Sequence, residues 1–250
     1  MMYSHESRLM NFWIQLFKLA INRKKTREDY FEFQEFQANH VIRDIKKILP
    51  LSASASVIDY GCGNGGYSYV LAREFKDVVC VDYFIDPVRE KFTKIDNARF
   101  ESADLITYRG DPKDFLFCAS VVEHIPLEKQ SLFIKNIGKN IRKNGYLYLS
   151  FPPFKSVIGG HLCAPFHYLP DRMAFYLTKK IKKYNISSFE TMYGSWGVFK
   201  TSIQDVEKWL LANAFKIIQI KPRYLPSSCS KIISKNNFLN WHAEFYCQNL

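Results

Sequence analysis

The sequence lacks the features that mark several common classes of protein. Its six cysteines include no C-x-x-C pair, which argues against a zinc site or a disulfide framework and predicts reduced thiols in a cytoplasmic chain. It has no internal repeats, no low-complexity segments and no carboxylate cluster typical of a catalytic metal site. A membrane-spanning helix needs about 20 apolar residues in a row, and no such run is present. What remains is a chain of 250 residues, 47% of them hydrophobic, which can bury a large core in one domain.

Acidic residues are scarce in one part of the chain. Residues 135–235 carry 17 Lys and Arg against 4 Asp and Glu, whereas residues 28–134 carry 12 against 18. A basic surface raises the local concentration of anionic ligands. The distribution therefore favours an anionic substrate or surface. Nucleic acid, phosphorylated glycan carriers and anionic lipid all stay open, as does a basic face that is simply solvated.

Glycines are concentrated in one short segment, which carries the strongest functional signal. Residues 57–66 read VIDYGCGNGG, an apolar strand that runs through Asp59 into a turn with glycines at positions 61, 63 and 65. Glycine lets the backbone turn tightly and approach a ligand closely, and the next residues, YSYVLAR, predict the start of a helix. A carboxylate such as Asp59 suits a ligand with an ammonium group better than a pyrophosphate. The pattern D-x-G-x-G-x-G also differs from the G-x-G-x-x-G pattern of dinucleotide-binding proteins.

Two more acidic residues follow predicted strands. Residues 78–82 read VVCVD, a nearly all-apolar run that is typical of a buried parallel strand and ends in Asp82. A carboxylate at that position can accept hydrogen bonds from both hydroxyls of a ribose. The next predicted strand lies in residues 98–105 and contains Asp104 near its end.

These features resemble motif I and the following strands of the class I S-adenosylmethionine-dependent methyltransferases, over about residues 38–151. The resemblance implies S-adenosylmethionine as the cofactor, with Asp82 on the ribose and Asp104 facing the adenine. It also implies a Rossmann-like, doubly wound α/β sheet of about seven strands, mostly parallel with an antiparallel last strand and with helices on both faces. The cofactor-binding residues that it predicts are Asp59, Tyr60, Gly61, Cys62, Gly63, Gly65, Asp82, Tyr83, Ala103, Asp104, Leu105, Ser120 and Val121.

The rest of the chain continues the resemblance. A Glu123-His124 pair follows strand four, as it does in the family segment that passes beneath the methyl donor. The pattern Ser202-x-x-Asp205 predicts a capped helix start. Ala214 stands before Phe215 where relatives usually have glycine, a change that affects the helix C-cap. The predicted strands four to seven cover residues 115–122, 146–151, 215–220 and 241–247.

Substrate recognition is expected in an insertion after strand five, residues 152–201, whose prolines, glycines and aromatic residues predict an ordered lid. Methyl transfer to a hydroxyl depends on positioning of the acceptor and gains from a general base. Histidine titrates in the right range for that role. His161, beside two glycines, is the first candidate for the catalytic base, His124 is the second and His167 the third. A structural histidine is the alternative for each.

The N-terminal segment has two interpretations. Residues 9–27 combine an aromatic-rich helical pattern with a basic flank. Such a helix can lie on an anionic membrane surface, here the inner face of a membrane, or it can pack on the domain and cap its pocket. We assign residues 1–37 to a helical cap segment and residues 38–250 to the methyltransferase domain.

The sequence thus predicts a cytoplasmic S-adenosylmethionine-dependent methyltransferase that acts on a hydroxyl of a sugar or another small metabolite, phosphorylated and lipid-linked acceptors included. The insertion is similar to that of methyltransferases found in glycan and polysaccharide biosynthesis. RNA methylation is the nearest alternative, although the chain has no RNA-binding module and no Asn/Asp-Pro-Pro-Tyr/Phe motif after strand four. A non-catalytic cofactor-binding scaffold of the same fold is the third.

Overall fold

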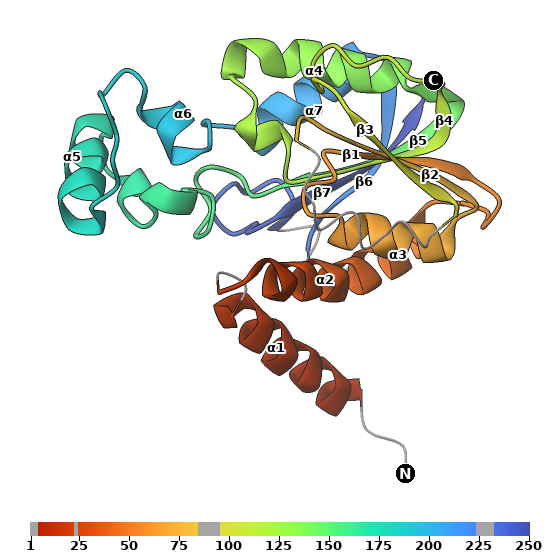
Figure 1. Cartoon of the computed structure of the whole chain (residues 1–250). Helices are drawn as coiled ribbons and strands as arrows, with labels where there is room; N and C mark the ends of the chain where they lie inside the picture. Colours follow the sequence, from red (N-terminus) through yellow and green to blue (C-terminus); the bar gives the residue numbers. More distant parts are fainter. Residues whose placement is uncertain (1–4, 23–24, 85–95, 224–232) are drawn as a thin grey trace. The chain divides into compact units, whose positions relative to one another are not determined.

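The computed structural model describes residues 5–22, 25–84, 96–223 and 233–250 of the chain (Figure 1). The chain forms two compact units, residues 1–104 and residues 105–250, each with its own strands and helices. Residues 23 and 24 of the segment predicted to contact a membrane lie outside the described residues. None of the described helices is long and apolar enough to cross a membrane.

The first unit is built on three parallel strands in the order β3-β2-β1. Its elements are α1 (His5–Asn22), α2 (Arg27–Ile48), β1 (Ser56–Tyr60), α3 (Gly66–Glu74), β2 (Asp77–Asp82) and β3 (Ala98–Ser102). Helix α3 packs on β1 and β2, α2 packs on α3, and α1 packs on α2. The β1 and β2 side chains are buried from Val57 to Tyr60 and from Val78 to Val81, as expected for parallel strands covered on both faces.

The predicted boundary after residue 37 falls inside α2. Thr26 caps the start of this helix, because its hydroxyl accepts a hydrogen bond from the Asp29 N–H at 3.0 Å. The buried side of α2 then continues without a break through Ala38 to Ile45. The N-terminal segment therefore shares one helix with the residues that follow it.

The second unit has four strands in the order β4-β5-β7-β6. Its elements are β4 (Lys113–Ala119), the 3-10 helix η2 (Val122–His124), α4 (Leu127–Lys139), β5 (Ile141–Phe151), the 3-10 helices η3 (His161–Cys163) and η4 (Phe166–Tyr168), α5 (Asp171–Lys182), α6 (Met192–Trp196), α7 (Ile203–Ala212), β6 (Phe215–Pro222) and β7 (Ala243–Asn249). Strands β4 and β5 are parallel, and β7 is antiparallel to both β5 and β6. The seven described strands thus confirm the predicted Rossmann-like architecture, mostly parallel with an antiparallel last strand.

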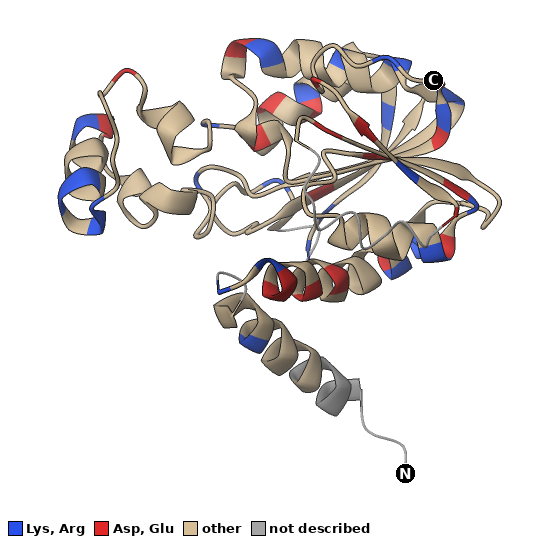
Figure 2. Cartoon of the chain, viewed as in Figure 1, with Lys and Arg blue, Asp and Glu red and all other residues tan. Residues whose placement is uncertain are grey.

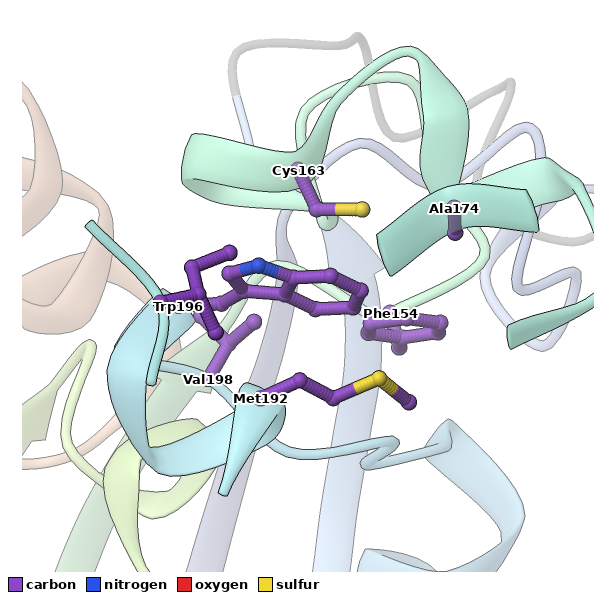
Figure 3. Packing of buried hydrophobic residues seen from close by; sticks show 7 residues of the cluster. Phe154, Cys163, Ala174, Met192, Trp196 and Val198 are labelled. Atoms are coloured by element: carbon purple, nitrogen blue, oxygen red, sulfur yellow. The ribbon is translucent and has the colours of Figure 1, made fainter. Parts of the chain in front are cut away.

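The insertion between β5 and α7 has a small core of its own. Figure 3 shows Trp196 packed among Phe154, Met192 and Val198. Cys163 and Ala174 belong to the same buried cluster. Helices α5 and α6 stand away from the strands of this unit (Figure 1). The insertion is therefore an ordered substructure, as predicted.

The connection from α7 to β6 contains a strained residue. Ser202 caps α7 as predicted, because its hydroxyl accepts a hydrogen bond from the Asp205 N–H at 3.1 Å. At the other end Ala214 has a φ of +60°, in the left-handed region that favours glycine. Ala214 thus adopts the conformation that a glycine would adopt without strain, although it has a Cβ.

Replacing Ala214 by glycine should stabilise the protein. A residue with a Cβ in the left-handed region costs about 1–2 kcal/mol, whereas glycine adds a backbone-entropy cost of about 0.5–1 kcal/mol. We expect Ala214→Gly to raise the free energy of unfolding by about 0.5–1 kcal/mol, measured by urea denaturation. The control is Ala212→Gly, at an exposed position in the last turn of α7, which should lower it by a similar amount. A loss of stability in both variants would contradict the strain at Ala214.

Candidate functional site

The glycine turn after β1 has a backbone shape that favours glycine. Gly61, Gly63 and Gly65 have φ angles of +88°, +51° and +84°, which residues with a Cβ rarely adopt. The N–H of Gly61 donates to the Val81 carbonyl at 2.8 Å, so the turn is tied to the end of β2. A Cβ on Gly63 would meet only the side chain of Gln34, at 3.9 Å. The backbone is therefore open to close approach by a ligand at this glycine.

Asp82 lies beside the glycine turn, as the sequence predicts. Its Oδ2 accepts a hydrogen bond from the Gly63 N–H at 2.8 Å, and its Oδ1 lies 3.4 Å from the N–H of Phe84. The side chain is half-buried at the end of β2, and the neighbouring Tyr83 is exposed. The turn and the carboxylate thus form one contiguous site in the first unit.

The other residues of the first unit that were predicted to bind the cofactor differ in burial and in their hydrogen bonds. Asp59 is only 2% exposed and accepts a hydrogen bond from the Ser68 hydroxyl at 2.6 Å, so it joins β1 to α3. Tyr60 and Cys62 have buried side chains and can offer a ligand only their backbone groups. The Ala103 N–H donates to the Asp82 carbonyl at 3.0 Å, and Asp104 is exposed at the end of the unit.

The end of β4 in the second unit is also sharply bent. Ser120 is exposed and has a φ of +57°, a conformation that is uncommon outside glycine and that often marks functional sites. Its N–H donates to the Ser150 carbonyl at 2.7 Å, and Val121 is buried next to it. Leu105, the remaining predicted residue, is half-buried, and its carbonyl accepts a hydrogen bond from Asn136 at 3.2 Å.

His124 is held in one tautomer by the insertion. Its Nδ1 donates a hydrogen bond to the carbonyl of Gly197, and the Phe199 N–H donates to the Glu123 carbonyl at 2.7 Å. The neutral ring therefore presents Nε2 as a lone pair. Desolvation lowers the pKa of His124 below its usual range, and the bond to Gly197 opposes that shift. The side chain is 44% exposed, so a neutral, base-competent nitrogen lies at the surface of this unit.

His161 lies next to His124, with 5.4 Å between the ring centroids. Two glycines allow this approach. A Cβ on Gly159 would lie 1.9 Å from the Pro153 carbonyl oxygen, and one on Gly160 would lie 2.3 Å from the His167 ring. The sequence analysis noted the glycines and both histidines, and the structure brings the two imidazoles together at the ends of β4 and β5.

His167 is a structural histidine. It is buried, and its Nε2 donates a hydrogen bond to the Ser156 carbonyl at 3.0 Å. Burial lowers its pKa. The third candidate for the base thus holds the insertion together.

Sequence reasoning missed the groups that surround the histidine pair. Glu123 was noted only as part of a motif, yet its side chain is buried, and both carboxyl oxygens lack a hydrogen-bond partner. The nearest ionisable atom is Nε2 of His124, at 3.9 Å from Oε1. Burial raises the pKa of Glu123 to about 8, opposed in part by its own backbone N–H and then by the charge of Arg223. Burial also lowers the pKa of His242 well below its usual range, helped by the charges of Arg223 and His161.

A buried polar network lies on the strands of the same unit. Glu244 on β7 accepts hydrogen bonds from the Arg223 guanidinium at 3.0 Å and from the Tyr148 hydroxyl at 2.7 Å. Its second oxygen accepts from Tyr246 at 3.0 Å and lies 3.5 Å from the ammonium of Lys221. The alternating positions of these residues in their strands were the only sequence signal for this network.

The second unit also contains a cavity of about 750 Å³. Aromatic rings of Phe154, Tyr168 and Phe238 line it together with the ammonium-bearing side chains of Lys155 and Lys200. Such a mixture of apolar walls and a few charged groups is typical of small-molecule sites.

The buried Glu123 should make stability depend on pH. Its folded-state pKa of about 8 exceeds the ordinary 4.5, so its contribution to stability is complete below pH 4.5 and is lost as pH rises to about 8. Glu123→Gln should therefore match wild type at acid pH. It should be more stable by a few kcal/mol at pH 8, since each pKa unit is worth about 1.4 kcal/mol. Denaturant titrations across this pH range measure the difference.

The control for this measurement is Glu128→Gln, on the exposed side of α4, which should keep the pH dependence of wild type. A Glu123→Gln variant that parallels wild type at every pH would show that folding does not raise the pKa of Glu123.

Comparisons with known proteins agree with this geometry. A family model described as a methyltransferase domain matches residues 33–200, more than half of the chain, and includes the insertion up to residue 200. A trans-aconitate 2-methyltransferase from Azoarcus sp. (strain BH72) is 24% identical over 128 residues, 50% of this chain and 49% of that protein. The chain thus spans about half the length of this curated relative.

Solved structures of low sequence identity share the fold. A magnesium protoporphyrin IX methyltransferase from Synechocystis PCC 6803 with bound SAH has a TM-score of 0.57 at 17% identity, covering 91% of this chain and 89% of that one. An S-adenosylmethionine-dependent methyltransferase from Clostridium acetobutylicum has a TM-score of 0.57 at 12% identity, covering 84% and 89%. The family match and the fold together show that the chain belongs to the methyltransferase domain family, within the class I S-adenosylmethionine-dependent methyltransferases, with S-adenosylmethionine as its cofactor.

Proposed function

We propose that the protein transfers a methyl group from S-adenosylmethionine to a hydroxyl of a small metabolite, and that a sugar or an anionic sugar derivative is the acceptor. The observation that carries this proposal is the neutral His124, whose Nδ1 is committed to Gly197 and whose Nε2 is left as a base beside His161. A role in cytoplasmic glycan biosynthesis is part of the same proposal.

The first unit fits the cofactor. The glycine turn supplies backbone in the positive-φ conformations that glycine favours, and Asp82 would supply carboxylate oxygens for the ribose hydroxyls. Asp104 is exposed, and we assign it to the adenine amino group on the strength of the sequence resemblance. Asp59, just before the turn, accepts a hydrogen bond from Ser68 in the helix that follows the turn, which fixes β1 relative to α3. When bound, the cofactor supplies an electrophilic methyl group on a sulfonium.

In this proposal, residues of the second unit take up the proton of the acceptor hydroxyl. When the acceptor oxygen takes the methyl group, with cleavage of the methyl–sulfur bond and release of S-adenosylhomocysteine, the acceptor proton would pass to Nε2 of His124. Gly197 holds the ring in place, because its carbonyl accepts a hydrogen bond from the Nδ1–H of His124 throughout. Glu123 lies 3.9 Å from Nε2, and with a pKa of about 8 it is mostly protonated at neutral pH, so a charged imidazolium beside it would favour release of its proton.

The cavity is a candidate site for a sugar acceptor, and the histidine in its lining is His167, not His124 or His161. Its aromatic rings suit the apolar face of a sugar, and its two lysines suit a phosphate or carboxylate. Lys200 is held in place by Asp171, with 2.7 and 2.8 Å between its ammonium and the two carboxylate oxygens.

A carboxylate acceptor is the second candidate, because the curated relative is named a trans-aconitate methyltransferase. A carboxylate is already ionised at neutral pH and needs no general base. The role of His124 therefore distinguishes a hydroxyl acceptor from a carboxylate acceptor. RNA methylation is supported only by the basic surface. A non-catalytic scaffold is supported only by the fold.

The cofactor placement predicts a loss of binding in Asp82→Asn. The amide oxygen can still accept the Gly63 N–H, but the charge that would hold the ribose is gone. Since hydrogen bonds to charged groups contribute about 1.5–3 kcal/mol, we expect the Kd for S-adenosylhomocysteine to rise at least about tenfold in isothermal titration. Asp77→Asn, at the opposite end of β2, should bind like wild type. Unchanged affinity in Asp82→Asn would remove Asp82 from the site.

The base assignment predicts a slow but cofactor-binding His124→Gln variant. Glutamine can still donate to Gly197 but cannot take up the hydroxyl proton. With radiolabelled S-adenosylmethionine and a panel of sugars, sugar phosphates and trans-aconitate, kcat on a hydroxyl acceptor should fall about 10²- to 10⁴-fold, while S-adenosylhomocysteine binding stays as in wild type. A rate that is unchanged in both His124→Gln and His161→Gln would exclude histidine catalysis and favour the carboxylate acceptor.

A further inference from the structure

Helix α5 of the insertion exposes several large apolar side chains. Met173, Tyr176 and Ile181 are 52%, 57% and 59% exposed, and Tyr184 just beyond the helix is 37% exposed. Met173 and Tyr176 are three residues apart and share one side of the helix, whereas Ile181 is exposed near the end of the helix, nearer to the side of the buried Ala174. This concentration on a helix of 12 residues is more than the scattered apolar residues normal on protein surfaces.

The same outer side of α5 is basic. Arg172, Lys179, Lys180 and Lys183 are all exposed, and Figure 2 shows that the charged residues of α5 are mainly basic. Asp171 is the one acidic residue of the helix, and both its oxygens are bonded to Lys200. The outer face of α5, defined here as residues 172, 173, 176, 179, 180, 181 and 183, therefore carries positive charge that no acid of the helix compensates.

The helix is firmly attached on its other side. Ala174 is buried in the core of the insertion, and Thr178 is buried beside Cys163. The Lys182 ammonium donates to the carbonyls of Leu162 and Ala164, which anchors the end of the helix. The apolar residues on the outer face are thus presented by a fixed helix.

We propose that the outer face of α5 binds the surface of a membrane that contains anionic lipid. Interfacial helices combine apolar side chains that enter the headgroup boundary with lysines that meet anionic headgroups, and α5 exposes both, with Met173 and Tyr176 on the same side as Lys180. This proposal goes beyond methyl transfer and is tested without any acceptor. If both proposals hold, the insertion holds the enzyme at the surface where a lipid-linked acceptor would be found.

The apolar residues favour a membrane over nucleic acid as the partner of this face. Phosphates of RNA are bound by lysine, and stacking on bases uses aromatic rings. Neither contact accounts for the exposed Met173 and Ile181, whose aliphatic and thioether side chains gain most from burial in an apolar medium.

The first unit offers a second surface for comparison. On α1, Ile14, Phe17 and Ile21 are exposed at helical spacing, next to the exposed Lys18. This is the segment that the sequence analysis assigned to membrane contact, so an experiment has to separate α1 from α5.

The test is flotation of the full chain with vesicles of phosphatidylcholine alone or with about 30% phosphatidylglycerol. Wild type should float with the anionic vesicles only, and high salt should release it, because the lysine contribution is screened. The double variants Met173→Ser with Ile181→Ser, and Lys179→Glu with Lys180→Glu, should each reduce the bound fraction at least about fivefold.

Two control variants complete the design. Lys208→Glu with Leu211→Ser makes the same kinds of change on the exposed face of α7 and should float like wild type. Ile14→Ser with Phe17→Ser tests α1. Each variant must bind S-adenosylhomocysteine like wild type, which shows that it is folded.

Several outcomes would overturn the proposal. Flotation that is lost only in the α1 variant would assign membrane contact to α1. Wild-type flotation by both α5 variants, or no flotation of wild type, would exclude α5 as a membrane surface. Retardation of RNA that depends on Lys179 and Lys180, without flotation, would assign the face to nucleic acid. A dimer seen by sedimentation and lost with Met173→Ser and Ile181→Ser would assign it to a second copy of the chain.

Discussion

One buried carboxylate, Glu244, holds together the polar interior of the second unit. It receives hydrogen bonds from Arg223, Tyr148 and Tyr246 and lies 3.5 Å from the Lys221 ammonium. Without it, two cations would be buried without compensation, which costs several kcal/mol per charge. Arg223 in turn donates to Ser150 at 2.6 Å, and its charge lowers the pKa of both Glu123 and His242. The protonation of Glu123 and His242 therefore depends in part on Glu244, the buried residue that holds Arg223 in place.

The insertion is joined to the residues after β4 by hydrogen bonds of its backbone. Its last segment, residues 197–199, bonds to Glu123 and His124 just after β4. Its outgoing part folds back at Gly159 and Gly160, which brings His161 beside His124. A change in the insertion would therefore reach His124, the proposed base, directly. The proposed membrane face of α5 lies on the same substructure, which also orients His124.

The first unit illustrates how much of a cofactor site a short sequence motif can contain. The positive φ angles of Gly61, Gly63 and Gly65 follow from local chain geometry, and the contact of Gly63 with Asp82 follows from the pairing of two neighbouring parallel strands. The motif and the strand pattern were therefore enough to predict that these residues meet. The burial of Asp59 under the turn was not predicted, because nothing in a strand pattern says which polar side chain finds a partner such as Ser68.

The sequence by itself determined the order of strands and helices, the glycine turn, the two carboxylates that follow strands, and the cap of α7. These depend on residues close in sequence or on the alternation of apolar positions. The sequence could not decide which hydrogen-bond partner fixes each histidine, because those partners are distant in the chain. His124 is set by Gly197 and His167 by Ser156. Nor could it reveal Glu123 as a buried acid with a raised pKa. The burial of Glu123, and the approach of Arg223 that partly opposes the shift, arise only when the second unit folds. Tertiary structure alone decided these properties, because desolvation and charge pairing arise between residues that the chain separates by up to a hundred positions.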